Sequence, residues 1–113
     1  MPDSFNQQGL LKGMGGPLGE VALRYEMEDR VLLRVLQDQA AKQGDKTWLV
    51  FDFDSKITFT EGYEMSCRVG HALIRDGFQG DHVALFMKNQ IEFFPTMYGA
   101  HAAGGVAVPL NAR

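Results

Sequence analysis

The stretch "GDHVALFMKNQIEFFPTMYGAHAAGGVAVPLN", residues 80–111, decides the fold class of this chain. It opens with a nearly continuous apolar run of strand length, as expected for a strand that is buried on both faces. A second short apolar run, "GVAVPLN", closes the stretch, and a segment of helical length separates the two. Strand 83–87, helix 91–103 and strand 105–109 therefore predict a βαβ unit with parallel strands and a right-handed crossover.

Two features mark the start of the predicted helix 91–103. Asn89 is followed three residues later by Glu92, which is the spacing of a capping box, so both residues are interpreted as capping groups rather than as polar site residues. Pro95 lies inside the predicted helix and removes a backbone donor. We therefore expect Pro95 to kink the helix or to delay its start.

Upstream of this unit, the segment "TEGYEMSCRVGHALIRDG" has the apolar and small-residue spacing of a second helix. One face of that helix carries Ser66, Val69, Gly70 and Leu73. Small residues on this face would let the helix approach a sheet closely, and Gly77 is expected to end it.

A β-hairpin is predicted before that helix. "TWLVFDF" and "KITFT" both alternate, and the turn formers Asp54 and Ser55 lie between them. In the first strand Leu49, Phe51 and Phe53 are expected on one side, and the second strand is expected to end at Thr60.

The segment "EDRVLLRVLQDQAAKQG" predicts the first helix of the ordered region. Glu28 and Asp29 are expected at its amino end, where the helix dipole favours acidic groups, and Gly44 at its stop. The residues expected on its apolar face are Leu32, Val35, Leu36, Gln39 and Ala40.

Residues 1–27 differ from the rest and are interpreted as a flexible arm that precedes a domain portion over residues 28–113. This arm holds five glycines and two prolines without a sustained period. Its "GMGGPLG" lacks the spacing of a dinucleotide-binding loop, because Leu18 stands where the third glycine belongs.

Composition narrows the class of protein. The chain has 113 residues, 45% hydrophobic and 22% charged, which is ordinary for one small globular domain. The net charge of −3 and the lack of a basic block argue against a nucleic-acid partner. The single cysteine, Cys67, fits a reducing compartment, and no Sec-type signal or membrane-spanning run is recognised, so a cytoplasmic location is expected.

Two constellations could carry chemistry by themselves. Asp52 and Asp54 follow an apolar run at the spacing of a phosphohydrolase nucleophile and its acid–base partner, but Lys56 stands where that pattern needs Thr or Val. The alternation on both sides favours a hairpin turn instead. Cys67 and His71 are four residues apart on one predicted helix, yet two ligands do not make a metal site, and His82 and His101 have no compatible spacing.

From "GDKTWLVF" onward the chain resembles the opening of the large N-terminal domain of AMP-forming acyl-CoA synthetases, over roughly residues 29–113. No single motif is strong, but five occur in order at the right spacing. The closing "VPLNAR" leans toward carnitine-type and medium-chain CoA ligases. The matching motifs are Gly44-Asp45-Lys46, Thr58-Phe59-Thr60-Glu61, Gly80-Asp81-His82-Val83-Ala84, Asn89 with Glu92-Phe93, and Gly105-Val106 with Val108-Pro109-Leu110-Asn111.

The resemblance implies an enzyme that joins a carboxylic acid to CoA through an acyl-adenylate, with ATP and magnesium. The phosphate loop, the magnesium and ribose carboxylates and the adenylation lysine of that family would all lie beyond Arg113. We therefore assign no catalytic, cofactor-binding or metal-binding residue within the chain, and we expect the chain alone to be inactive.

Two functions from different classes remain open at this point. The first is the N-terminal portion of an acyl-CoA ligase, which would expose an open sheet edge and an apolar sheet face and would therefore self-associate in isolation. The alternative is a free-standing α/β binding or interaction module without catalysis.

Overall fold

The computed structural model describes residues 25–29 and 31–111, and the chain divides into two units, residues 1–31 and 32–113, which are taken separately. Nearly all of the predicted arm, residues 1–27, lies outside the described residues. In the first unit the structure describes a 3₁₀-helix, η1, at Met27–Asp29. There the amide of Asp29 donates a hydrogen bond to the carbonyl of Glu26 over 3.0 Å.

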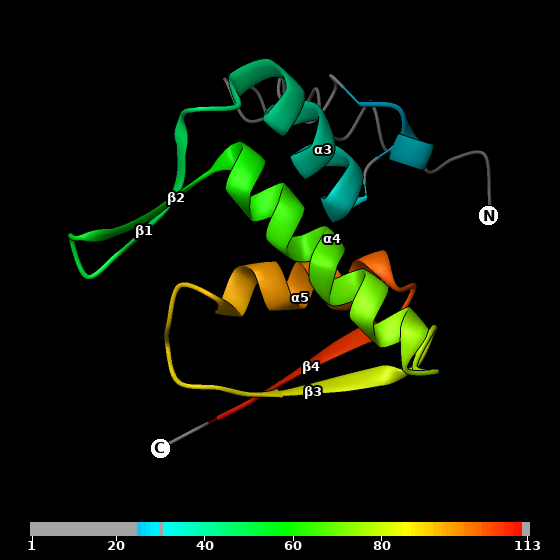
Figure 1. The fold of residues 1–113 in the computed structure, drawn as a ribbon. Coiled ribbons are helices and arrows are strands. Elements are labelled where there is room, and N and C mark those ends of the chain that lie inside the picture. The colour runs from blue at the N-terminus through cyan, green and yellow to red at the C-terminus, as the bar shows by residue number, and fades with distance from the viewer. Residues whose placement is uncertain (1–24, 30, 112–113) are drawn as a thin grey trace, which may run out of the picture. The chain divides into compact units, whose positions relative to one another are not determined.

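The second unit has the predicted order of helix, hairpin, helix and βαβ unit (Figure 1). Figure 1 shows α5 lying between α4 and the pair of strands β3 and β4. The small-residue face of α4 was expected to approach a sheet, but it packs on α5, since a β-carbon at Gly70 would lie 2.9 Å from that of Ala102. The α/β fold class read from the sequence is confirmed. The elements are α3 Leu32–Gln43, β1 Thr47–Phe51, β2 Ser55–Thr58, α4 Phe59–Arg75, β3 His82–Phe86, α5 Phe93–Ala102 and β4 Val106–Leu110.

The strands β3 and β4 pair in parallel, as predicted for the βαβ unit, and their bounds differ from the predicted ones by one residue. The register places His82 beside Val106 and Phe86 beside Leu110. Leu85, with 2% exposure, points to the side that α5 covers, where Ala100 is also buried. The core of the unit therefore lies on one side of this two-stranded sheet.

The prediction for the start of α5 is wrong about the capping residue and right about the effect of Pro95. The cap position is Glu92, which makes no capping hydrogen bond through its side chain, and Asn89 lies outside the helix. The helix begins at Phe93 instead of residue 91, so the delay expected from Pro95 is confirmed. Pro95 is thus the third helical residue, where the amide has no partner within the helix, and its ring is fully buried.

The helix α4 begins at Phe59, within the stretch that was expected to end the second strand of the hairpin. Thr58 is its N-cap: the Thr58 hydroxyl accepts from the Glu61 amide over 3.1 Å, and the Thr58 amide donates to the Glu61 carboxylate over 3.3 Å. This capping box recruits Phe59 and Thr60 into the first turn, so the prediction that the second strand ends at Thr60 is wrong.

We expect the substitution Thr58→Ala to lower the free energy of unfolding by about 1 kcal/mol, because the exposed amides of the first turn of α4 lose their cap. Thr47→Ala is the matched control, since Thr47 pairs with Thr58 across the hairpin but caps no helix. Urea titration followed through the fluorescence of the single tryptophan measures both variants. Equal losses for the two variants would contradict the capping role.

The first helix of the second unit starts later than predicted. Glu28 and Asp29 belong to η1, and α3 begins at Leu32, so these acidic residues are not in its first turn. Leu36 is buried as expected, whereas Leu32, the first helical residue, remains 46% exposed. The helix stops at Gln43, immediately before Gly44, as predicted.

The hairpin is confirmed, with β1 and β2 antiparallel and Phe51 opposite Ser55. Three residues close it, and Asp52 and Phe53 have positive φ values of 53° and 64°. The amide of Asp54 donates to the carbonyl of Asp52 over 2.7 Å. Phe53 was expected on the face of Leu49 and Phe51, but it lies in the turn and is 91% exposed. The left-handed turn rotates it away from the strand.

An aromatic cluster ties the hairpin to the helices. The ring of Trp48 on β1 lies 5.3 Å from that of Tyr98 on α5 and 6.5 Å from that of Phe59 on α4. Gly62 of α4 faces the indole so closely that a β-carbon there would meet Trp48. The lack of a side chain at residue 62 therefore lets the indole ring pack directly against α4.

Candidate functional site

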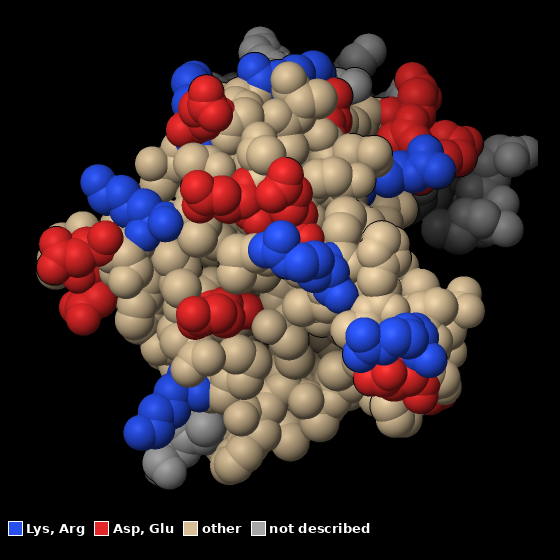
Figure 2. All heavy atoms as spheres, in the orientation of Figure 1, with Lys and Arg blue, Asp and Glu red and all other residues tan. Residues whose placement is uncertain are grey.

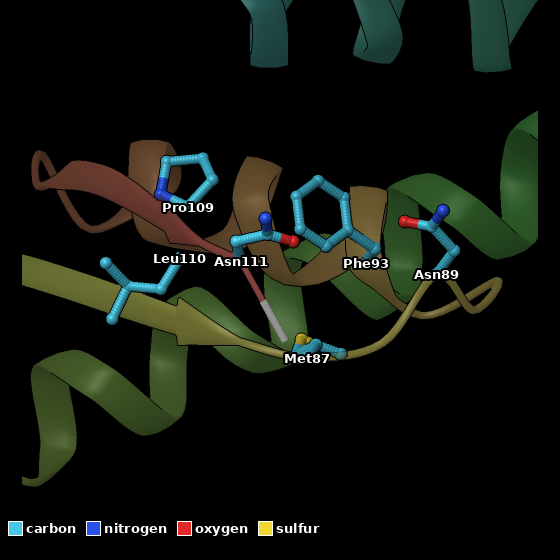
Figure 3. A pocket seen from close by; sticks show the side chains of 6 residues that line it. All are labelled: Met87, Asn89, Phe93, Pro109, Leu110 and Asn111. Atoms are coloured by element: carbon cyan, nitrogen blue, oxygen red, sulfur yellow. The ribbon is translucent and has the colours of Figure 1, made fainter. Parts of the chain in front are cut away.

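The described residues of the second unit form a cleft at the carboxyl ends of β3 and β4, with a volume of about 330 Å³ (Figure 3). In open α/β sheets this end of the parallel strands is where ligands bind. Its lining comes from two segments that are distant in sequence: the β3–α5 connection with the first residue of α5, and the end of β4 with the residue after it. The lining residues are Met87, Asn89, Phe93, Pro109, Leu110 and Asn111.

Each wall of the cleft combines apolar surface with one amide. Figure 3 shows Asn89 on the connection that follows β3 and Asn111 just past β4, with the ring of Phe93 between them. Asn89 is free to line the cleft because it does not cap α5. An amide can donate and accept hydrogen bonds, but it is neither an acid nor a base near neutral pH.

The cleft can therefore bind and orient a neutral polar group, and its own lining holds no general acid or nucleophile. Sequence reasoning missed this site. Asn89 was interpreted as a cap, and Asn111 was noted only within a motif. The signal that could have found them is topological, because each residue lies shortly after the carboxyl end of a parallel strand of one βαβ unit.

The residues singled out from the sequence lie elsewhere. Asp52 and Asp54 are exposed in the hairpin turn on either side of Phe53, which confirms the hairpin interpretation of this stretch. On α4, Cys67 is half-buried and His71 is exposed. Among the residues that the structure describes, no group of three or more His, Cys, Asp or Glu side chains could hold a metal ion.

Shifted pKa values, each with a local cause, occur among the described residues at Tyr63, at Tyr98 and at the ion pair of Arg75 and Asp76. The hydrogen bond with the Cys67 side chain raises the pKa of Tyr63, and burial raises the pKa of Tyr98 in the aromatic cluster. The guanidinium of Arg75 lowers the pKa of the exposed Asp76 carboxyl, which it contacts over 2.9 Å. None of these groups lines the cleft.

On the face drawn in Figure 2, acidic and basic side chains of the described residues are interspersed over the surface. This distribution agrees with the small net charge of −3. Within the described residues, no helix is long and apolar enough to cross a membrane.

Comparison with known proteins identifies the class to which this α/β unit belongs. Residues 36–113 match the family described as AMP-binding enzyme. Since the match covers more than half of the sequence, the chain belongs to the AMP-binding enzyme family. The resemblance read from the sequence motifs is thereby confirmed.

The curated relatives are acyl-CoA and acyl-AMP ligases, and the chain aligns with their N-terminal part. The chain is 37% identical over 70 residues to 4-hydroxybutyrate–CoA ligase 2 of Metallosphaera sedula, covering 61% of this chain and 13% of that protein. It is 33% identical over 87 residues to crotonobetaine/carnitine–CoA ligase of Citrobacter koseri, covering 73% of this chain and 17% of that protein. The chain therefore spans about one sixth or less of these relatives.

Solved structures give the same placement. The N-terminal domain of FACL13 from Mycobacterium tuberculosis superimposes with a TM-score of 0.66 and 32% identity. The superposition covers 73% of this chain and 21% of that domain. The described fold thus matches a portion of the N-terminal domains of adenylate-forming enzymes.

Proposed function

We propose that this chain is the N-terminal portion of an ATP-dependent acid–thiol ligase, which activates a carboxylic acid as an acyl-adenylate and transfers it to CoA. The observation that carries this proposal is the family match over residues 36–113, because it covers the hairpin, α4 and the whole βαβ unit without interruption. The relatives named above support the substrate class, since each is a CoA ligase of a carboxylic acid by name.

Within this proposal the chain supplies scaffold. Its described residues position two parallel strands and the cleft at their ends, and the cleft is lined by amides and apolar groups rather than by acids or bases. ATP, magnesium and CoA are proposed for the complete ligase, and the groups that act on the α-phosphate are proposed to lie outside this chain. The cytoplasm is the compartment proposed for this chemistry, because it keeps thiols reduced.

A chimera tests the proposal. Residues 36–113 replace the aligned segment of the Citrobacter koseri ligase, and the exchange of labelled pyrophosphate into ATP is measured with and without crotonobetaine or carnitine. We expect acid-dependent exchange within about tenfold of the host enzyme, since a scaffold of the same fold keeps the reacting groups in register. The control is the same host carrying an unrelated βαβ segment of equal length. A folded chimera that shows no more exchange than this control would contradict the proposal.

The hairpin aspartates give a further prediction in the same chimera. Asp52→Asn is expected to leave the acid-dependent exchange rate within about twofold, because the turn lies outside the cleft and its carboxylates are exposed. The comparison variant is Asn89→Asp, which exchanges the same two residue types in the opposite direction and places a charge at the cleft. A loss of several orders of magnitude with Asp52→Asn, in a chimera that still folds, would restore the catalytic-pair hypothesis.

A further inference from the structure

One face of the sheet formed by β3 and β4 has no cover within the described residues of the second unit, since α5 packs on the other face (Figure 1). Phe86 is 71% exposed on it, Val106 50% and Leu110 47%. The register brings Phe86 beside Leu110, and the pair of Ala84 and Val108 lies between them and Val106. We call this surface the outward face. Its members are Ala84, Phe86, Val106, Val108 and Leu110.

The outward face is apolar throughout, since none of its five members has a polar or charged side chain. At one end His82 shares the same side, because it is two residues from Ala84 and pairs with Val106. A contiguous apolar surface of this kind indicates an interaction site. The occupant must itself be apolar, because the face offers no charge to bind an ionic partner.

The two edges of this sheet are not equivalent. The amide of Val106 donates to the carbonyl of Asp81 over 3.1 Å, so the backbone groups of Val106 point toward β3. Because backbone groups alternate in direction along a strand, those of Ala107 and Pro109 point toward the outer edge of β4. Pro109 has no amide hydrogen, which blunts that edge against a further strand. Natural sheets often protect an edge in this way.

On β3 the backbone groups of successive residues also point alternately toward the neighbouring strand and away from it. The Asp81 carbonyl points toward β4, so the backbone groups of His82, Ala84 and Phe86 point toward the free edge. All three residues keep an amide hydrogen and a carbonyl. The edge of β3 is therefore able to accept a neighbouring strand, and the described sheet has only the strands β3 and β4.

The partial coverage of a solved relative is the argument for one occupant of these surfaces. The chain covers only 21% of a solved N-terminal domain with the same fold. A two-stranded sheet is marginal by itself, so a domain that uses it must add strands and cover both faces. The free edge of β3 and the outward face are the positions at which the described unit can receive such additions.

We propose that the outward face and the edge of β3 form the docking surface for the complementary portion of a ligase N-terminal domain. That portion adds a strand along His82, Ala84 and Phe86 and packs an apolar element on the outward face. The inference rests on the proposed function, and it adds which surface of the chain the rest of the domain binds.

Co-expression in trans tests the proposal. The full 113-residue chain is produced with the FACL13 N-terminal domain from which the segment aligned with residues 36–113 has been deleted. Co-elution and the dissociation constant are measured without ATP or acid. We expect a 1:1 complex, and we expect Phe86→Glu to raise its Kd by about tenfold or more, because a charge would be desolvated inside an apolar interface.

Phe53→Glu is the matched control, since it makes the same exchange at an exposed aromatic residue on the hairpin turn, away from the outward face. It should leave the Kd within about twofold. Amide hydrogen exchange provides a measurement that needs no variant, and exchange over residues 82–86 should slow in the complex by about tenfold or more. Without the complementary domain, the chain is expected to self-associate through the same face, and the domain should convert these species to the 1:1 complex.

The proposal is overturned if the wild-type chain fails to co-elute, if Phe86→Glu and Phe53→Glu bind equally well, or if exchange over residues 82–86 is unchanged in the complex. A homodimer that persists in excess complementary domain also overturns it, because the occupant would then be a second copy. An active chimera together with failed co-elution would leave the proposed function standing and remove only this docking surface. Co-elution with an inactive chimera would leave the docking surface standing and remove the proposed function.

Discussion

Substitution of Trp48 by alanine is expected to lower the free energy of unfolding by about 3 kcal/mol, because truncating a large aromatic side chain leaves a cavity that the surroundings fill only in part. The indole contacts Phe59 and Tyr98 and lies over Gly62, so its loss separates β1 from both helices at once. Far-UV circular dichroism during urea titration measures the change, since the variant has no tryptophan fluorescence.

The control for Trp48→Ala is Phe53→Ala, which also removes an aromatic ring from the hairpin. Because Phe53 is 91% exposed, its loss should cost less than about 0.5 kcal/mol. Similar losses for the two variants would show that the aromatic cluster does not hold the hairpin on the helices. The loss of unfolding free energy for Trp48→Phe should fall between the losses for these two variants, since phenylalanine keeps part of the contact area.

Replacement of Gly99 by alanine is expected to cost about 2–3 kcal/mol, the upper range for overpacking a tight contact. A β-carbon at residue 99 would meet the side chain of Val69 on α4 and would lie 2.9 Å from the carbonyl oxygen of Ser66. Neither atom is the end of a flexible chain, so α4 and α5 must move apart. Thermal melting and urea titration should both report the loss.

Gly44→Ala provides the matched exchange at a less crowded position. There a β-carbon would lie 3.2 Å from the Thr60 hydroxyl oxygen, which can rotate away, so the expected change is within about 1 kcal/mol. If Gly99→Ala were no more destabilising than Gly44→Ala, the close approach of α4 and α5 would be refuted.

The order of elements was predictable from the sequence because each carries a local signal. The apolar runs at 83–87 and 105–109, the alternation around the hairpin and the glycines that end α3 and α4 all act over a few residues. Where two local signals compete, the prediction failed. The alternation of Ile57 and Phe59 favoured a strand, but the capping box between Thr58 and Glu61 starts the helix at Phe59.

The cleft and the outward face could not be read from local patterns. Asn89 and Asn111 are 22 positions apart in the sequence. They line the same cleft only because β3 and β4 end side by side. Phe86 belongs to an apolar run that is typical of a strand buried on both faces. The resemblance to a larger domain led us to expect one exposed sheet face, but only the structure shows that it is the face of Phe86. Both features depend on how strands pair, which no short window of sequence contains.

The central claim is that this chain contributes scaffold rather than chemistry to a ligase, and acid-dependent pyrophosphate release by the pure 113-residue chain tests it most directly. The chain is supplied with magnesium, ATP, CoA and a panel of fatty and carnitine-like acids. The account predicts no release above that seen with ATP alone, because the chain spans 17% of the Citrobacter koseri ligase and the described lining of its cleft holds no acid or base. Release that increases with acid concentration and saturates would contradict it.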